Sequence, residues 1–128
     1  MYKIGEIAQK TDVTTRTLRY YEEMGILKPS KISETGYRYY DDNAPLIIER
    51  IKNLQHVGLS LIEIKEVIGL YFLEGKPLEA KEKTITYLKT HLDQINSKIE
   101  MMQRAKTEIE EQIISTQEKL LRLKTKNK

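Results

Sequence analysis

Apolar residues near the start of the chain recur with the spacing of two short helices. Ile4 and Ile7 predict a first helix over about residues 4–10. After a tight turn, Leu18 and Tyr21 continue the apolar stripe on a second helix. Two short helices joined by a tight turn have the spacing of a helix-turn-helix motif.

Local signals set the ends of the second helix. Asp12 tolerates the left-handed backbone that the turn requires, and Thr14 is predicted to be the N-cap. Gly25 is predicted to end the helix, and Pro29 prevents the helix from resuming.

A change of composition over residues 28–40 predicts a small β-hairpin, because Pro, Ser, Thr and Gly replace the helical pattern. Asp42 or Asn43 is expected to cap a third helix, with Pro45 in its first turn and Gly58 after its end.

A capping box that starts at Ser60 predicts a fourth helix, which is expected to end near Leu70. The apolar residues assigned to the third and fourth helices are Leu46, Ile47, Ile51, Leu54, Val57, Ile64, Val67, Ile68 and Tyr71.

A long heptad seam begins after a break at residues 75–77, and its members alternate at steps of three and four. Its apolar members, which are predicted to mediate dimerisation, are Ile85, Leu88, Leu92, Ile95, Ile99, Met102, Ile109, Ile113 and Leu120; Lys106, Thr116 and Leu123 continue the same seam. A helix of roughly 40 residues extends about 60 Å, which is too long to be buried against a small domain. No Gly or Pro follows Pro77, so an intramolecular hairpin is disfavoured and a second copy is the simplest partner.

Two features of this helix each have two interpretations. Lys106 either fixes the register of the coiled coil or extends its side chain to solvent at the edge of the seam. The basic residues near the end either form a solvated helix terminus or a nucleic-acid arm. These residues are Lys119, Arg122, Lys124, Lys126 and Lys128.

Composition narrows the class of protein. The chain has 128 residues, a net charge of +3 and no cysteine, which excludes disulfides and thiolate metal sites. Residues 1–75 hold ten Lys or Arg against eleven Asp or Glu, so net charge alone does not indicate nucleic-acid binding. Neither a signal peptide nor an apolar span of roughly 20 residues is present, and we expect a cytoplasmic protein with no membrane partner.

The placement of cations and phenols is more informative than the net charge. Within residues 14–39, arginines, hydroxyls and tyrosines recur on one helix and then on the hairpin, which suits contact with a phosphate backbone. Arg19 has an alternative role as an ion-pair partner of Glu22 or Glu23 on its own helix. Leu18, Tyr21 and Tyr40 are expected to lie in the core.

The order of these motifs resembles the MerR family of bacterial transcription regulators over roughly residues 2–71. The resemblance rests on Ile4-Gly5-Glu6-Ile7-Ala8, Arg16-Thr17-Leu18-Arg19-Tyr20-Tyr21-Glu22, Gly25-Ile26-Leu27, Pro29, Gly36-Tyr37-Arg38-Tyr39 and Gly58-Leu59-Ser60. The long last helix also resembles the antiparallel dimerisation helix of that family.

The resemblance implies a mainly helical fold, in which a winged helix-turn-helix domain with a small β-hairpin wing precedes a long antiparallel coiled-coil helix. The expected boundaries are 1–71 for the DNA-binding domain, 72–78 for a linker, 79–124 for the dimerisation helix and 125–128 for a basic tail. The residues expected to contact DNA are Thr14, Thr15, Arg16, Thr17, Arg19, Tyr20, Lys31, Tyr37, Arg38 and Tyr39.

The resemblance further implies a homodimer that binds pseudo-palindromic, double-stranded promoter DNA and distorts it. Such a dimer activates or represses transcription, with RNA polymerase as its partner at the promoter. No cofactor is expected. Without cysteines, His56 and His91 are poor metal ligands, and thiol sensing is excluded.

A small-molecule effector would need a pocket around Tyr71, Phe72, Tyr87 and the dimerisation helix. The alternative is that these residues only pack the fourth helix against the long helix. Either arrangement fits the sequence.

The sequence also bears on other classes of function. No phosphate loop or nucleophile beside a histidine is present, so we expect no enzyme. The rivals are an excisionase-like architectural DNA-binding protein and a coiled-coil adaptor that binds protein. The adaptor leaves the placement of arginines and tyrosines unexplained.

Overall fold

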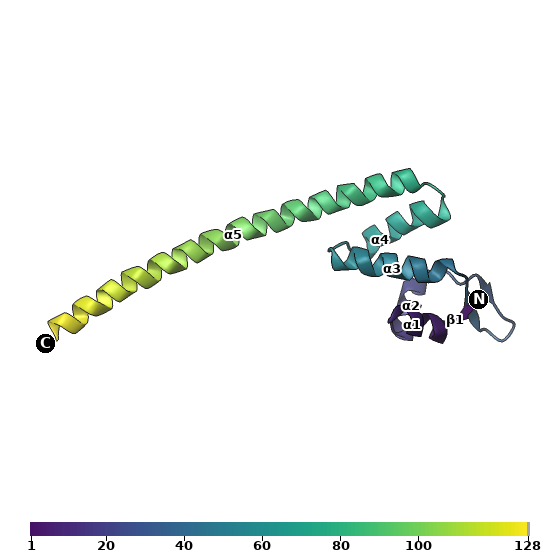
Figure 1. The fold of residues 1–128 in the computed structure, drawn as a ribbon, viewed down its shortest axis with the longest axis horizontal. Coiled ribbons are helices and arrows are strands. Elements are labelled where there is room, and N and C mark those ends of the chain that lie inside the picture. The colour runs from purple at the N-terminus through teal and green to yellow at the C-terminus, as the bar shows by residue number, and fades with distance from the viewer. Residues whose placement is uncertain (128) are drawn as a thin grey trace. The chain divides into compact units, whose positions relative to one another are not determined.

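The computed structural model describes residues 1–127, so Lys128 of the predicted basic tail lies outside the described residues. The chain divides into two units, a compact one over Met1–Lys89 and a second one that begins at Thr90. Figure 1 shows the order of the elements along the chain.

The predicted helix-turn-helix is confirmed. Helix α1 spans Ile4–Thr11 and α2 spans Thr15–Glu23. Between them Asp12 has a left-handed backbone with φ of 55°. The Thr14 hydroxyl accepts the backbone N–H of Thr17 at 3.1 Å, and this bond satisfies a donor that the first helical turn leaves unpaired.

The wing is a three-stranded antiparallel sheet rather than a hairpin alone. Strands β2 (Lys31–Ile32) and β3 (Arg38–Tyr40) form the predicted hairpin, and β1 (Tyr2–Lys3) pairs with the other edge of β3. Tyr2 lies opposite Tyr40, and Lys31 lies opposite Tyr39. The sequence prediction did not include β1, because two residues are too few to show an alternating pattern.

The third helix, α3, spans Asn43–His56 and starts as predicted, but its cap differs. Neither Asp42 nor Asn43 supplies the side-chain cap. Instead Asp41 Oδ1 accepts the backbone N–H of Asn43 at 2.9 Å. A carboxylate near a helix N-terminus is also favoured by the helix dipole.

The fourth helix, α4, spans Leu61–Ile68 and begins with the predicted capping box. Ser60 and Glu63 exchange two side-chain to backbone hydrogen bonds, at 2.9 and 3.2 Å. The helix does not simply end near Leu70 as predicted. It continues as a π-helical turn, η1 (Gly69–Leu73), in which the Glu74 N–H donates to the Gly69 carbonyl at 3.0 Å.

The core of the compact unit is built by the inner faces of α1 to α4 together with Tyr40 from the sheet. Ile7, Leu18, Ile48, Ile51 and Ile64 are completely buried. Three of the apolar residues assigned to the third and fourth helices are exposed, and these are Leu46, Val57 and Tyr71, of which Tyr71 was expected to face the core. On α3 the inward face consists of Ala44, Ile48, Ile51 and Leu54, so Leu46 lies on another side of the helix.

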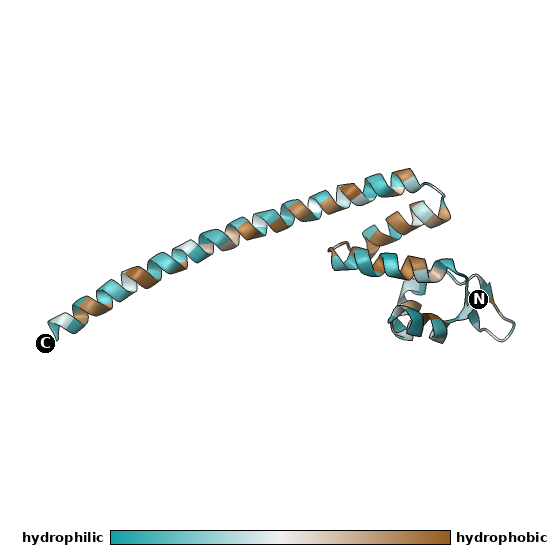
Figure 2. Cartoon of the chain, in the orientation of Figure 1, coloured by the Kyte–Doolittle hydropathy of each residue, from teal (hydrophilic) through white to brown (hydrophobic). Residues whose placement is uncertain are grey.

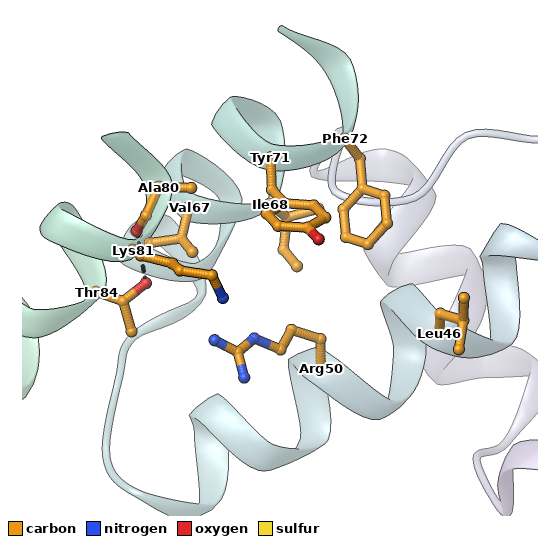
Figure 3. A pocket seen from close by; sticks show the side chains of 9 residues that line it. All are labelled: Leu46, Arg50, Val67, Ile68, Tyr71, Phe72, Ala80, Lys81 and Thr84. Atoms are coloured by element: carbon orange, nitrogen blue, oxygen red, sulfur yellow. Dashed lines mark hydrogen bonds between the residues drawn. The ribbon is translucent and has the colours of Figure 1, made fainter. Parts of the chain in front are cut away.

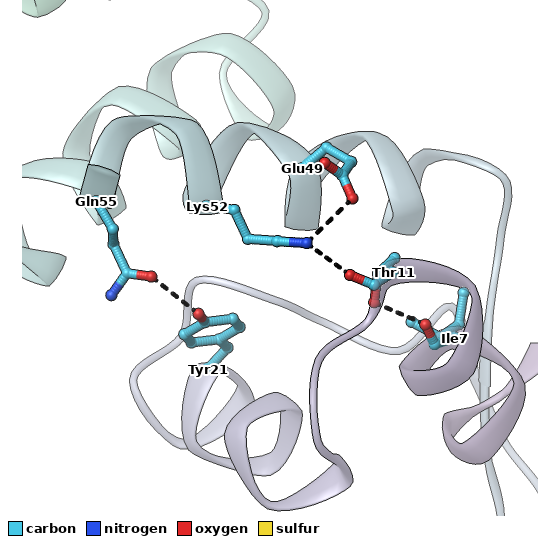
Figure 4. Close-up of polar contacts among 6 residues, drawn as sticks. All are labelled: Ile7, Thr11, Tyr21, Glu49, Lys52 and Gln55. Atoms are coloured by element: carbon cyan, nitrogen blue, oxygen red, sulfur yellow. Dashed lines mark hydrogen bonds and ion pairs between the residues drawn. The ribbon is translucent and has the colours of Figure 1, made fainter. Parts of the chain in front are cut away.

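Polar contacts from α3 hold both helices of the motif in place (Figure 4). Lys52 Nζ donates to the Thr11 carbonyl at 2.8 Å and lies 3.6 Å from Glu49 Oε1. The Tyr21 hydroxyl donates to Gln55 Oε1 at 3.1 Å. A cation at the C-terminal end of α1 also complements its dipole.

The last helix, α5, spans Pro77–Lys126 and contributes its first turns to the compact unit. Ala80 and Thr84 are buried, and Glu66 on α4 accepts a hydrogen bond from Tyr87 and forms a salt bridge with Lys83 at 3.1 Å. The hydrogen bond to Glu66 raises the pKa of the Tyr87 phenol to about 12. The compact unit therefore extends further along the chain than the expected boundary at residue 71.

From Thr90 onward apolar residues recur along α5 among polar ones (Figure 2). The seam residues of this unit are exposed, with Ile99 at 49% and Ile109 at 60% of their full accessible surface. Within residues 1–127, no helix has both the length and the apolar character that crossing a bilayer requires.

Candidate nucleic-acid interface

The outer face of α2 carries the cations that the sequence singled out. Leu18 and Tyr21 anchor the opposite face in the core, which leaves Arg16, Arg19 and Tyr20 exposed. In the described part of the chain, neither Arg16 nor Arg19 forms a salt bridge. Both guanidinium groups are therefore available to a phosphate or a base edge.

The threonines at the start of α2 have two kinds of surroundings. Thr14 is exposed, but its hydroxyl caps the helix and lies 2.8 Å from the Thr17 hydroxyl. Thr15 and Thr17 are half-buried. These side chains set the position of the first turn of α2, the part of a recognition helix that reaches base edges.

The tip of the wing presents Tyr37, whose side chain is 62% exposed. The turn before it is closed by Ser33, whose hydroxyl accepts the Tyr37 N–H at 3.0 Å, while Gly36 adopts φ of 85°. That φ suits glycine, since side chains with a Cβ rarely adopt it. Lys3 Nζ lies 6.0 Å from the centre of the Tyr37 ring, which adds to the wing a cation that the sequence reasoning missed.

Arg38 has a partner inside the protein. Its Nε lies 2.8 Å from Glu22 Oε2, which joins the wing to the end of α2. The Glu22 side chain is only 10% exposed, and its second oxygen is buried without a hydrogen bond among the described residues. Burial raises the pKa of the Glu22 carboxyl, and the charges of Arg38 and Arg19 oppose that shift.

This pair changes two expectations. Glu22 pairs with Arg38 rather than with Arg19, which leaves Arg19 unpaired as described above. Arg38 remains half-exposed, at 46%, so its side chain is still accessible from solvent. Sequence spacing gave no signal for the pair, because its members are far apart along the chain and meet only after the wing folds back.

The remaining wing residues follow their positions in the sheet. Lys31 is exposed on the edge strand β2, and Tyr39 is half-buried on the central strand. Tyr40 is completely buried, as expected of a core residue, although no hydrogen-bond partner for its hydroxyl is found among residues 1–127. Within the same residues, no group of three or more His, Cys, Asp or Glu side chains is arranged to hold a metal ion.

Comparison with known proteins identifies the family. The MerR HTH family regulatory protein family matches residues 2–69, and the family described as MerR, DNA binding matches residues 47–112. The chain belongs to the MerR family. It is a DNA-binding transcription regulator, as the resemblance of its motifs predicted.

One relative matches almost end to end. The HTH-type transcriptional regulator YyaN of Bacillus subtilis is 31% identical over 122 residues, which cover 94% of this chain and 88% of YyaN. Another relative is matched over only part of its length. The chain is 33% identical to the nodulation protein NolA of Bradyrhizobium diazoefficiens over 98 residues and spans 37% of its length.

Solved structures share the fold. A MerR family transcriptional regulator from Listeria monocytogenes superposes with a TM-score of 0.68 at 22% identity, and each chain is covered completely. HiNmlR, a MerR family regulator lacking the sensor domain, was solved bound to promoter DNA. It superposes with a TM-score of 0.57 at 21% identity, with 80% of this chain and 76% of HiNmlR covered.

Proposed function

We propose that two copies of this MerR-family regulator bind one pseudo-palindromic promoter site, with α2 of each copy in the major groove and each wing on the flanking backbone. In this arrangement residues 1–71 bind DNA and residues 79–124 dimerise. The observation that carries the proposal is the outer face of α2, where Arg16, Arg19 and Tyr20 are exposed beside a helix N-terminus.

The proposed contacts fall into two groups. Arg16 and the half-buried Thr15 and Thr17 lie on the first turn of α2, where they would meet base edges. The others would hold phosphates and so fix the orientation of the protein. This second group consists of Arg19, Tyr20, Lys31, Tyr37, Arg38 and Tyr39.

A salt titration of DNA binding tests the phosphate contacts. Arg19→Ala is expected to weaken binding to all duplexes and to reduce the slope of log affinity against log salt by about one. Arg104→Ala removes an exposed cation from α5 and serves as the matched control. Equal slopes for both variants would contradict the proposed role of α2.

The seam of α5 supports dimerisation. Eight of its apolar members, from Ile85 to Leu120, are about half exposed or more in the single chain, whereas Leu88 is half-buried against its own compact unit. A contiguous apolar face of this length is typical of a protein interface. A second copy is the proposed partner because it carries the same seam.

The position of Lys106 favours an antiparallel pair. In a parallel pair in register, Lys106 would face Lys106 of the second copy, and two like charges would meet inside the seam. The seam steps of three and four read the same from either end. An antiparallel pair centred on the seam therefore places Lys106 opposite Met102 and Leu92 opposite Thr116.

Crosslinking distinguishes the two orientations, and the absence of native cysteine makes the experiment clean. Leu92→Cys protein mixed with Thr116→Cys protein is expected to form the mixed disulfide under mild oxidation. Disulfides between two copies of Leu92→Cys, together with no mixed species, would indicate the parallel pair instead.

We further propose that the dimer distorts its site and acts together with RNA polymerase, either to activate or to repress. Deforming DNA costs several kcal/mol, which contacts from two linked domains can offset. The test is to select bound genomic fragments and then transcribe them in vitro. DNA bending with no change in transcript level would point to an architectural protein rather than a regulator.

A further inference from the structure

A pocket of about 320 Å³ lies in the compact unit, away from the outer face of α2. Figure 3 shows its walls, which come from α3, from the end of α4 with η1, and from the first turns of α5. Val67 and Ile68 supply buried apolar surface, and Tyr71 and Phe72 add two aromatic side chains to the wall. The volume is in the range of small-molecule sites.

Two cations reach into this pocket from different helices. Arg50 extends from α3 and Lys81 from α5, and Figure 3 shows their charged ends pointing into the same space. Neither side chain has a carboxylate partner in the part of the chain that the structure describes. No acidic residue lines the pocket. Two like charges placed together in this way favour an anionic ligand.

The aromatic wall lies on the π-helical turn. Consecutive residues Tyr71 and Phe72 of η1 both line the pocket, with ring centres 4.8 Å apart. Lys81 Nζ lies 5.7 Å from the centre of the Tyr71 ring, which links the aromatic wall to the charged one. Single π-helical turns are frequent at functional sites.

We propose that this pocket binds a small organic anion with a flat apolar body, of the aromatic carboxylate class. The carboxylate pairs with the fork of Arg50 and with the Lys81 ammonium, and the ring lies against Val67, Ile68 and Phe72. A bare inorganic anion would leave the apolar floor unused, and a neutral aromatic compound would leave both cations unpaired.

The site offers a route to regulation, an inference that rests on the proposed function. Its walls join α3, which contacts α1 through Lys52 and α2 through Gln55, to the start of the helix that carries the seam. A ligand that holds these elements in one arrangement changes DNA affinity if the bound and free proteins differ in that arrangement.

Titration of the full chain with 2-naphthoate, monitored by calorimetry, tests the pocket without reference to DNA. Saturable binding of 2-naphthoate is expected. The neutral analogue 2-naphthamide is expected to bind at least about tenfold more weakly. Arg50→Gln and Lys81→Gln should each weaken naphthoate binding by about tenfold. Arg104→Gln removes a cation outside the pocket and should leave binding unchanged.

Several results would overturn the proposal: no saturable binding, equal binding of the amide, or affinity unaffected by both pocket variants. Arg50 and Lys81 are exposed, so thermal melting should confirm that the variants fold. If a second copy fills the pocket in the dimer, naphthoate will not bind, and the proposal fails.

A separate measurement of DNA affinity with and without naphthoate distinguishes failure of the proposed function from failure of the regulatory role. Naphthoate binding without any DNA binding would contradict the proposed function and leave the pocket standing. DNA binding that naphthoate saturation does not alter would remove the regulatory role alone.

Discussion

Isoleucines at helical spacing have opposite surroundings in the two units. Ile48 and Ile51 on α3 are completely buried, whereas Ile99 and Ile109 on α5 are 49% and 60% exposed. The residue type is the same in both places, and each pair belongs to an apolar pattern with helical periodicity. Apolar periodicity therefore predicts that a helix has a face to bury, but the partner that covers it comes from the rest of the fold or from another chain.

Truncation in the compact unit should have the largest effect. Ile51→Ala removes methyl groups from a site with no exposed surface, and it is expected to lower the free energy of unfolding by about 2–5 kcal/mol. Denaturant melts at low and high protein concentration should show the same loss. A loss that disappears at high concentration would mean that Ile51 is stabilised by assembly instead.

A charge in the seam should act through assembly. Ile99→Asp is expected to weaken the dimer by on the order of 2 kcal/mol per chain, because an unpaired carboxylate would have to enter the interface. Sedimentation at several concentrations measures the change. Ser97→Asp adds the same charge to the side of the helix away from the seam.

If Ile99→Asp and Ser97→Asp assembled equally well, the seam would not be the dimer interface. The compact unit should keep its own thermal transition in both variants, because neither residue belongs to it. A loss of folding in residues 1–89 in either variant would mean that the compact unit does not fold independently of the seam.

The features that the sequence could predict are those set by neighbours along the chain. The Thr14 cap, the Ser60–Glu63 capping box and the turn at Asp12 each depend on residues a few positions apart, and each is present. Features set by distant contacts were missed. Strand β1 forms only because β3 offers it an edge.

The same difference between local and distant contacts applies to the candidate site. The exposure of Arg16, Arg19 and Tyr20 could be predicted because Leu18 and Tyr21 fix which side of α2 faces inward. The pairing of Arg38 with Glu22 could not, since no local pattern indicates where the wing folds back.

The cap of α2 allows a smaller test of the compact unit. Thr14→Ala should cost about 1 kcal/mol of stability, since the Thr17 N–H loses its acceptor. Thr14→Ser keeps the hydroxyl and is expected to retain most of the stability. Chemical denaturation of both variants measures the difference, and equal losses would mean that the methyl group matters rather than the cap.

The smallest expected effect is a pH dependence from Glu22. Burial raises the pKa of its carboxyl above the ordinary value of 4.5, so the folded state favours the protonated form. Stability from this group is present below pH 4.5 and is lost as the pH rises through the folded pKa. Glu22→Gln cannot titrate and should flatten that part of the curve of unfolding free energy against pH.

An unchanged curve of unfolding free energy against pH in Glu22→Gln would contradict this role of Glu22. A steeper fall in stability with rising pH in Glu22→Gln than in the wild type would also contradict it, because that would mean that ionised Glu22 stabilises the fold. The Arg38→Ala variant should enlarge the wild-type dependence, since the opposing cation is removed.

The proposed function requires that two chains, joined through the exposed seam, bind one DNA site through two copies of α2. Native mass spectrometry of the protein with duplexes selected from genomic DNA counts the chains on each duplex. We expect two chains per duplex and a footprint with two related half-sites about one helical turn apart or a multiple of it. One chain per duplex on a single half-site would contradict it.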